Sequence, residues 1–74
     1  MKEINNAEDF FALAVENYRR GKFQEAINSF NQSLALKEDW QSYQGLGWAL
    51  YNMQQYQAAI DAFNQSLALK EYFQ

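Results

Sequence analysis

The chain has 74 residues and a formal net charge of −3, and 49% of its residues are hydrophobic. This length predicts one domain near the lower limit for a stable core, and the composition is too apolar for a disordered segment. The acidic balance argues against nucleic acid, which favours a basic stripe, and the lack of Cys and His excludes disulfides, thiol nucleophiles and the usual zinc sites.

The first predicted helix covers about residues 7–20. Asn6 precedes it as a candidate N-cap, and Gly21 follows it as a left-handed stop. Phe10, Leu13 and Ala14 form its apolar stripe at helical spacing.

The second predicted helix covers about residues 23–37. Its apolar residues recur at i, i+3, i+4, i+7 and i+11, which indicates a single helical stripe. These residues are Phe23, Ala26, Ile27, Phe30 and Leu34.

The third and fourth predicted helices cover about residues 40–53 and 56–72. Asp39 is a candidate N-cap for the third, whose stripe contains Tyr43, Leu46, Gly47 and Leu50. The fourth repeats the spacing of the second with Tyr56, Ala59, Ile60, Phe63 and Leu67. No strand pattern competes, so the predicted class is all-α, with about four helices in tandem antiparallel hairpins.

An internal duplication organises the chain. The segment FNQSLALKE occurs at residues 30–38 and again, unchanged, at 63–71, so equivalent positions differ by 33 in sequence number. At the same offset Leu13 pairs with Leu46 and Tyr18 with Tyr51. We therefore expect a single domain over residues 1–74, made of one repeat at 7–39 and another at 40–72.

These residues resemble the tetratricopeptide repeat family, whose unit is a helix–turn–helix of about 34 residues. The second unit carries the motif as Tyr43, Leu46-Gly47, Tyr56, Ala59-Ile60 and Phe63, and the first carries Phe10, Leu13-Ala14, Gly21, Phe23, Ala26-Ile27 and Phe30. Three features differ from the family pattern. The period is one residue short, Glu38 and Glu71 replace the usual Pro, and Gln54-Gln55 stands where Gly is expected.

The resemblance implies a helical solenoid whose first helices line a concave groove that binds peptide segments of partner proteins. The matching positions are Glu8, Phe11, Val15, Tyr18, Arg19, Gln41, Gln44, Trp48, Tyr51 and Asn52. Only Arg19 and Asn52 suit the carboxylate clamp known in the family, so we expect a groove that prefers apolar or aromatic side chains. The alternative is that some of these aromatic residues only seal helix against helix.

Self-association is a second expectation, because two repeats leave the last helix uncovered and a stack generally needs at least three. The chain is then part of a longer array, or a second copy supplies the cover. The sequences around 37–39 and 53–57 contain no strong helix breaker, so one junction could straighten and give a domain-swapped dimer. An ordinary short turn at each junction is the alternative.

The functional prediction is a protein-interaction scaffold that binds a protein or peptide in the cytoplasm. The alternative is a structural self-association module without a foreign ligand. We expect no enzyme, cofactor or metal, because the carboxylates are scattered singly or lie on polar helix faces. No apolar stretch is long enough for a membrane span or a signal peptide, so no membrane partner is expected.

Overall fold

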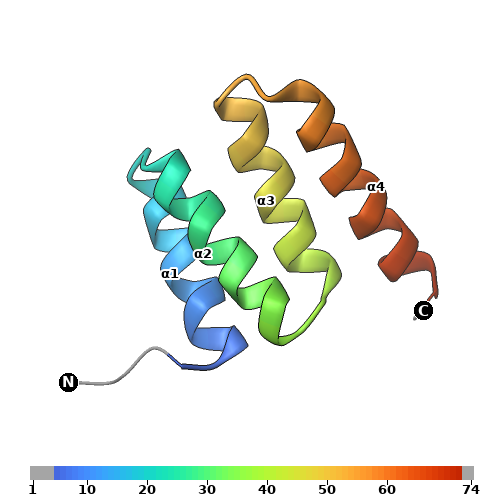
Figure 1. Cartoon of the computed structure of the whole chain (residues 1–74), viewed down its shortest axis with the longest axis horizontal. Helices are drawn as coiled ribbons and strands as arrows, with labels where there is room; N and C mark the ends of the chain where they lie inside the picture. Colours follow the sequence, from blue (N-terminus) through green and yellow to red (C-terminus); the bar gives the residue numbers. More distant parts are fainter. Residues whose placement is uncertain (1–4, 73–74) are drawn as a thin grey trace.

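Four helices make up the structure, which is a computed structural model that describes residues 5–72. They are α1 (Ala7–Arg19), α2 (Phe23–Leu36), α3 (Trp40–Asn52) and α4 (Tyr56–Tyr72) (Figure 1). The described residues contain no strand. The predicted all-α class is confirmed, and each helix boundary lies within one residue of its predicted place. Phe73 and Gln74 of the C-terminal tail lie outside the described residues.

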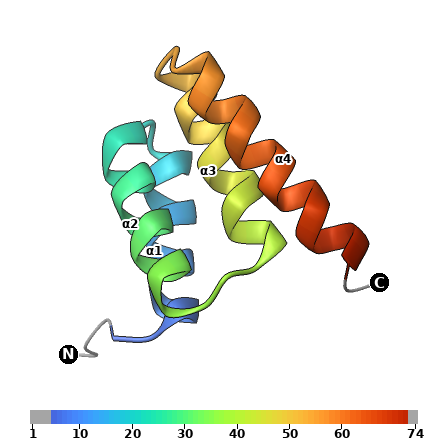
Figure 2. The same cartoon turned by 45° about the vertical axis from the view of Figure 1, so that its right-hand side comes forward.

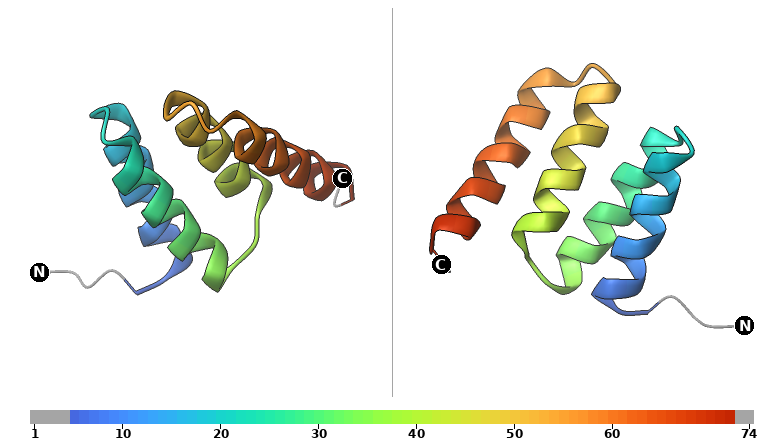
Figure 3. Two further views of the ribbon diagram at one scale, coloured as in Figure 1. Left: turned by 45° about the horizontal axis from the view of Figure 1, so that its top comes forward. Right: turned by 180° about the vertical axis from the view of Figure 1, so that it is seen from behind.

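The helices form two consecutive antiparallel hairpins, α1–α2 and α3–α4, packed beside each other (Figures 1 and 2). The turns within the hairpins lie at one end, and the connection between α2 and α3 lies at the other (Figure 3). Helix α3 is in the middle, since it packs against α1, α2 and α4. Among the described helices α4 contacts only α3, so one of its sides has no neighbour.

The predicted N-caps are both confirmed. Asn6 has an extended backbone, and its Oδ1 accepts a hydrogen bond from the backbone N–H of Asp9 at 2.8 Å. Asp39 caps α3 in the same way, with its Oδ1 2.7 Å from the backbone nitrogen of Ser42. Each cap satisfies one of the N–H groups that have no partner within the first turn of a helix.

The same hydrogen-bonded turn closes both hairpins. After α1, the N–H of Lys22 bonds to the carbonyl of Asn17 across Gly21, which has φ 77°. After α3, the N–H of Gln55 bonds to the carbonyl of Leu50 across Gln54, which has φ 63°. Gln54 therefore occupies a left-handed position that favours glycine. At the end of α2, the C-cap Lys37 has an extended backbone, and its N–H bonds to the carbonyl of Ser33.

Small residues bring the helices into contact. Ala14, Ala26 and Ala49 are fully buried in the same core cluster as Phe30, which is only 2% exposed. A Cβ atom on Gly45 would lie 2.3 Å from that ring, and one on Gly47 would lie 2.7 Å from the ring of Phe63. The two glycines therefore let α3 approach α2 with one face and α4 with another.

One serine hydroxyl in each hairpin bonds its two helices together at the open end. Ser33 Oγ donates a hydrogen bond to the carbonyl oxygen of Ala7 at 2.8 Å. Ser66 Oγ, at the equivalent position of the second repeat, donates to the carbonyl oxygen of Trp40 at the same distance. The hydroxyls bridge the end of one helix to the beginning of its partner, so the duplicated sequence gives duplicated tertiary contacts.

Replacing Gln54 with Gly is expected to raise the free energy of unfolding by about 0.5–1 kcal/mol. The left-handed conformation costs a residue with a side chain on the order of 1–2 kcal/mol, and the greater freedom of glycine in the unfolded chain offsets part of the gain. Urea unfolding measures the change. The reverse substitution at the equivalent position, Gly21→Gln, should lower stability, and a stability of Gln54→Gly at or below that of the parent would contradict the prediction.

Replacing Gly45 with Ala is expected to destabilise the chain by up to about 2 kcal/mol. Overpacking against the immobile Phe30 ring costs roughly 1–3 kcal/mol, which exceeds the gain of about 1 kcal/mol in helix propensity. Gly47→Ala is the matched control, because the Phe63 ring is partly exposed and can shift. Thermal unfolding should rank Gly45→Ala well below Gly47→Ala, and equal melting temperatures would show that the Phe30 contact is not limiting.

Candidate functional site

An apolar cavity opens between α1 and α3, which we call the central pocket. It has a volume of about 410 Å³. Val15 and Tyr18 line it from α1, and Gly45 and Trp48 line it from α3. Phe30 of α2 forms its floor, since this nearly buried ring is reached only because Gly45 has no side chain. The pocket thus depends on the same contact that packs α2 against α3.

Trp48 forms the most exposed wall of the central pocket, with 48% of its surface accessible. Its indole ring packs edge-to-face on Phe63 at a centroid distance of 5.3 Å and on Tyr51 at 5.9 Å. Tyr51 in turn packs against Tyr56 at 5.5 Å. The indole is therefore held in place from the α4 side while about half of its surface stays open to solvent.

One polar bridge links α1 to α3 beside the central pocket. The amide nitrogen of Asn52 donates to the hydroxyl of Tyr18 at 2.9 Å and to the carbonyl oxygen of Trp48 at 2.8 Å. These two bonds use both N–H donors of the amide, so only its carbonyl oxygen is left for a ligand. The Tyr18 hydroxyl accepts in this bridge and keeps its own proton to donate.

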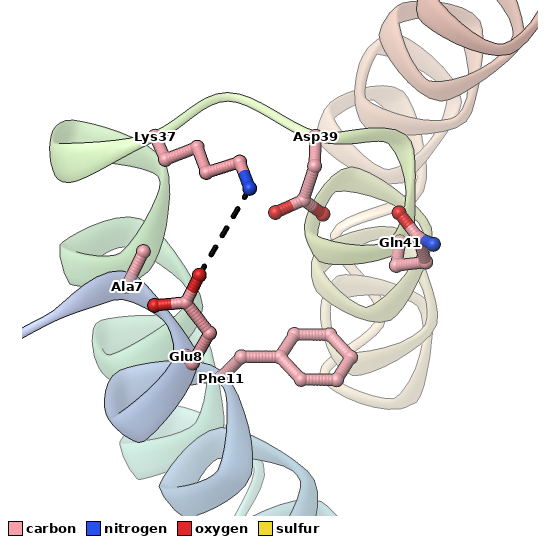
Figure 4. Close-up of a pocket in the computed structure, with 6 residues that line it drawn as sticks. All are labelled: Ala7, Glu8, Phe11, Lys37, Asp39 and Gln41. Carbon is pink, nitrogen blue, oxygen red and sulfur yellow. Dashed lines mark ion pairs between the residues drawn. The ribbon is translucent and has the colours of Figure 1, made fainter.

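A second cavity, the end pocket, has a volume of about 270 Å³ and lies where α1 and α3 begin (Figure 4). Its lining combines both signs of charge with apolar groups: Ala7, Glu8, Phe11, Lys37, Asp39 and Gln41. The ammonium of Lys37 lies 3.9 Å from a carboxylate oxygen of Glu8, and both side chains are well exposed. Such an exposed ion pair contributes little to stability.

The ten residues implied by the family resemblance fall into three groups. Val15, Tyr18 and Trp48 line the central pocket, with Tyr51 and Asn52 in contact with its walls; Glu8, Phe11 and Gln41 line the end pocket. Arg19 and Gln44 are exposed and line neither pocket.

Two of the predicted groove residues also pack between helices. The ring of Phe11 lies edge-on to Phe30 at a centroid distance of 5.9 Å, and that of Tyr18 lies edge-on to Phe23 at 5.3 Å. Both are partly buried against the core, as is Val15. Phe11 and Tyr18 therefore do both: they pack helix against helix, as considered from the sequence, and they line the cavities.

Sequence reasoning did not identify several of the lining residues. The helical stripe assigns Phe30 to packing, and no cavity was predicted at Ala7, Lys37, Asp39 or Gly45. Gly45 carries the one usable signal, because a glycine inside a helical pattern often marks a close approach of two segments. Lys37 and Asp39 reach the end pocket only through the path of the connection between α2 and α3.

Two residues outside both cavities have shifted pKa values. The hydrogen bond and charge of Arg20 lower the pKa of Glu16, while burial and then a hydrogen bond to Glu38 raise the pKa of Tyr43. Neither residue lines a cavity.

Over residues 5–72, His, Cys, Asp and Glu side chains form no group of three or more able to hold a metal ion. In the same range, no helix combines the length and hydropathy needed to cross a membrane.

Comparison with known proteins identifies one family. The tetratricopeptide repeat matches residues 7–40 and again residues 40–73, so the two matches cover nearly the whole chain. No curated protein and no solved structure was found to match. The two matches coincide with the α1–α2 and α3–α4 hairpins, whose caps, turns and serine bridges recur at equivalent positions. The chain therefore belongs to the tetratricopeptide repeat family, as two tandem repeats.

Proposed function

We propose that the chain binds a peptide segment of a partner protein between α1 and α3, with an apolar or aromatic side chain of the peptide anchored in the central pocket. Tetratricopeptide repeats generally mediate protein–protein interaction, and the family is a non-enzymatic interaction repeat. The observation that carries the proposal is an open apolar cavity with a half-exposed Trp48 as its wall and a nearly buried Phe30 as its floor.

The chemistry of the lining favours an apolar anchor. Aromatic residues in well-packed pockets dominate the energetics of protein interfaces, and Trp and Tyr are enriched among such positions. Trp48 and Tyr18 provide this kind of surface, and both are held by neighbouring rings, so little side-chain freedom is lost on binding.

Recognition of a carboxylate is not favoured at this site. Arg19 lies outside the central pocket, and the Asn52 amide donates both of its protons within the chain. What remains is the Asn52 carbonyl oxygen and the Tyr18 hydroxyl, which suit the N–H and C=O groups of a peptide backbone. We therefore assign these two groups to orientation of the peptide and the pocket to affinity.

Substitution of Trp48 with Ala should weaken peptide binding at least about tenfold, which corresponds to roughly 1.4 kcal/mol. The probes are peptides selected from a displayed random library with the full chain, and fluorescence anisotropy measures their dissociation constants. Arg19→Ala is the matched control and should change binding less than about twofold, a small free-energy difference on this scale. The selected peptides should share an apolar or aromatic position.

Thermal unfolding of both variants checks that the fold is intact before binding is compared. Equal, small effects of Trp48→Ala and Arg19→Ala would exclude the central pocket as the binding site. A library that yields no peptide dependent on Trp48 would instead favour the alternative of a self-association module without a foreign ligand, whose oligomeric state light scattering then measures.

A further inference from the structure

The end pocket contains charged groups that the proposed function does not use. In Figure 4 the carboxylates of Glu8 and Asp39 point toward the same space, and the ring of Phe11 lies below them. The ammonium of Lys37 points between the two carboxylates. The carboxylates outnumber the ammonium, so the pocket has a negative formal charge next to an aromatic ring. A cation of this chain already lies at the mouth of the pocket.

The Lys37 ammonium holds its place only weakly. Its nitrogen lies 3.9 Å from Oε1 of Glu8, and the two side chains are 64% and 74% exposed. An exposed pair at this distance contributes at most about 1 kcal/mol, because water screens both charges. A cation from outside can therefore take the place of the ammonium at little cost.

The carboxylate of Asp39 also has acceptor sites to spare. Its Oδ1 accepts from the N–H of Ser42 at 2.7 Å, and its Oδ2 accepts from the hydroxyl of Ser42 at 3.3 Å. An ionised carboxylate offers about four acceptor sites on its two oxygens, so about two remain for a ligand. The N-cap of α3 can therefore bind a donor in the end pocket while it caps the helix.

Phe11 adds an aromatic surface to the two carboxylates. Its ring lines the end pocket and is held edge-on to Phe30 at a centroid distance of 5.9 Å. A planar guanidinium can stack on such a ring and direct its five N–H donors to carboxylates at its edge. An ammonium is a compact point charge that cannot do both equally well. The combination of ring and carboxylates therefore favours arginine.

The end pocket and the central pocket are neighbours in the space between α1 and α3. The ring of Phe11 lines the first, and the ring of Phe30, which it contacts, is the floor of the second. Along α3 the lining passes from Gln41 to Trp48, which at 1.5 Å per residue is about 10 Å. An extended peptide covers this distance with about three residues.

We propose that the end pocket is an arginine subsite of the peptide groove. It binds the guanidinium of a peptide arginine that lies about three or four residues from the apolar anchor of the central pocket. The guanidinium stacks on Phe11 and replaces the Lys37 ammonium between Glu8 and Asp39. The formal net charge of −3 on the chain favours encounter with a basic segment. This inference rests on the proposed function and adds a second residue to the recognised peptide.

An arginine scan of a bound peptide tests the subsite. The parent is an acetylated peptide without Lys or Arg, selected from the displayed library with the full chain and weakened by Trp48→Ala. Each position is replaced by arginine in turn, and fluorescence anisotropy measures the dissociation constants. Arginine about three or four residues to one side of the anchor should tighten binding about fivefold, as expected for a charge-assisted contact. Citrulline, which is uncharged and of similar shape, should restore the parent affinity there.

Variants of the chain locate the arginine. Glu8→Gln and Asp39→Asn should each remove most of the gain and leave the parent peptide's affinity unchanged, and Asn keeps the N-cap of α3. Lys37→Gln should act in the opposite direction and enlarge the gain, because it removes the competing cation. Glu25→Gln is the matched control, since it removes the same charge from an exposed position of α2 outside both pockets. Thermal unfolding checks that each variant is folded.

The outcomes separate the subsite from the groove itself. An equal gain from arginine at every position, or a gain that Glu25→Gln lowers as much as Glu8→Gln does, would show general charge attraction and overturn the subsite. A Trp48-dependent peptide that gains from arginine at no position would overturn the subsite alone. Selection of no Trp48-dependent peptide would overturn the proposed function as well. A gain at one position that depends on Glu8 and Asp39 supports the subsite.

Discussion

The contact between the ring of Phe30 and the backbone of Gly45 is the constraint on which the other features depend. It allows α2 and α3 to approach closely enough to bury Ile27, Ser42 and Ala49. The same contact exposes the edge of the Phe30 ring to the space between α1 and α3, where it forms the floor of the central pocket. Packing between the two repeats and the proposed binding site therefore both depend on the absence of a side chain at Gly45.

The duplication is unequal, and the inequality gives the molecule two different ends. The second helices of the repeats are nearly identical, but their environments differ, because α3 covers α2 and no described helix covers the far side of α4. The first helices differ in sequence. Helix α3 has small residues toward both neighbours, whereas α1 carries Glu16 and its Arg20 partner on the face equivalent to the one that α3 packs on α2.

Local signals predicted most of the fold. The caps at Asn6 and Asp39 and the stop at Gly21 depend on neighbouring residues only, so they could be identified without tertiary information. The turn at Gln54 was less apparent. A glutamine is a good helix former, and it adopts the left-handed conformation here in the same hydrogen-bonded turn that closes the first hairpin. Packing of α4 on α3 supplies the free energy that offsets the local preference.

The sequence by itself determined the number and type of the helices, the repeat offset and the set of residues on the first helix of each repeat. Helical periodicity and caps are local properties, and duplication is visible as identity. Only the tertiary structure decided which of those residues gather around a cavity, because that depends on the distance between α1 and α3. It placed Val15 and Trp48 across the Phe30 ring, used the Asn52 amide in a bridge to Tyr18, and left Arg19 aside. These outcomes follow from how closely whole helices approach, which no single segment specifies.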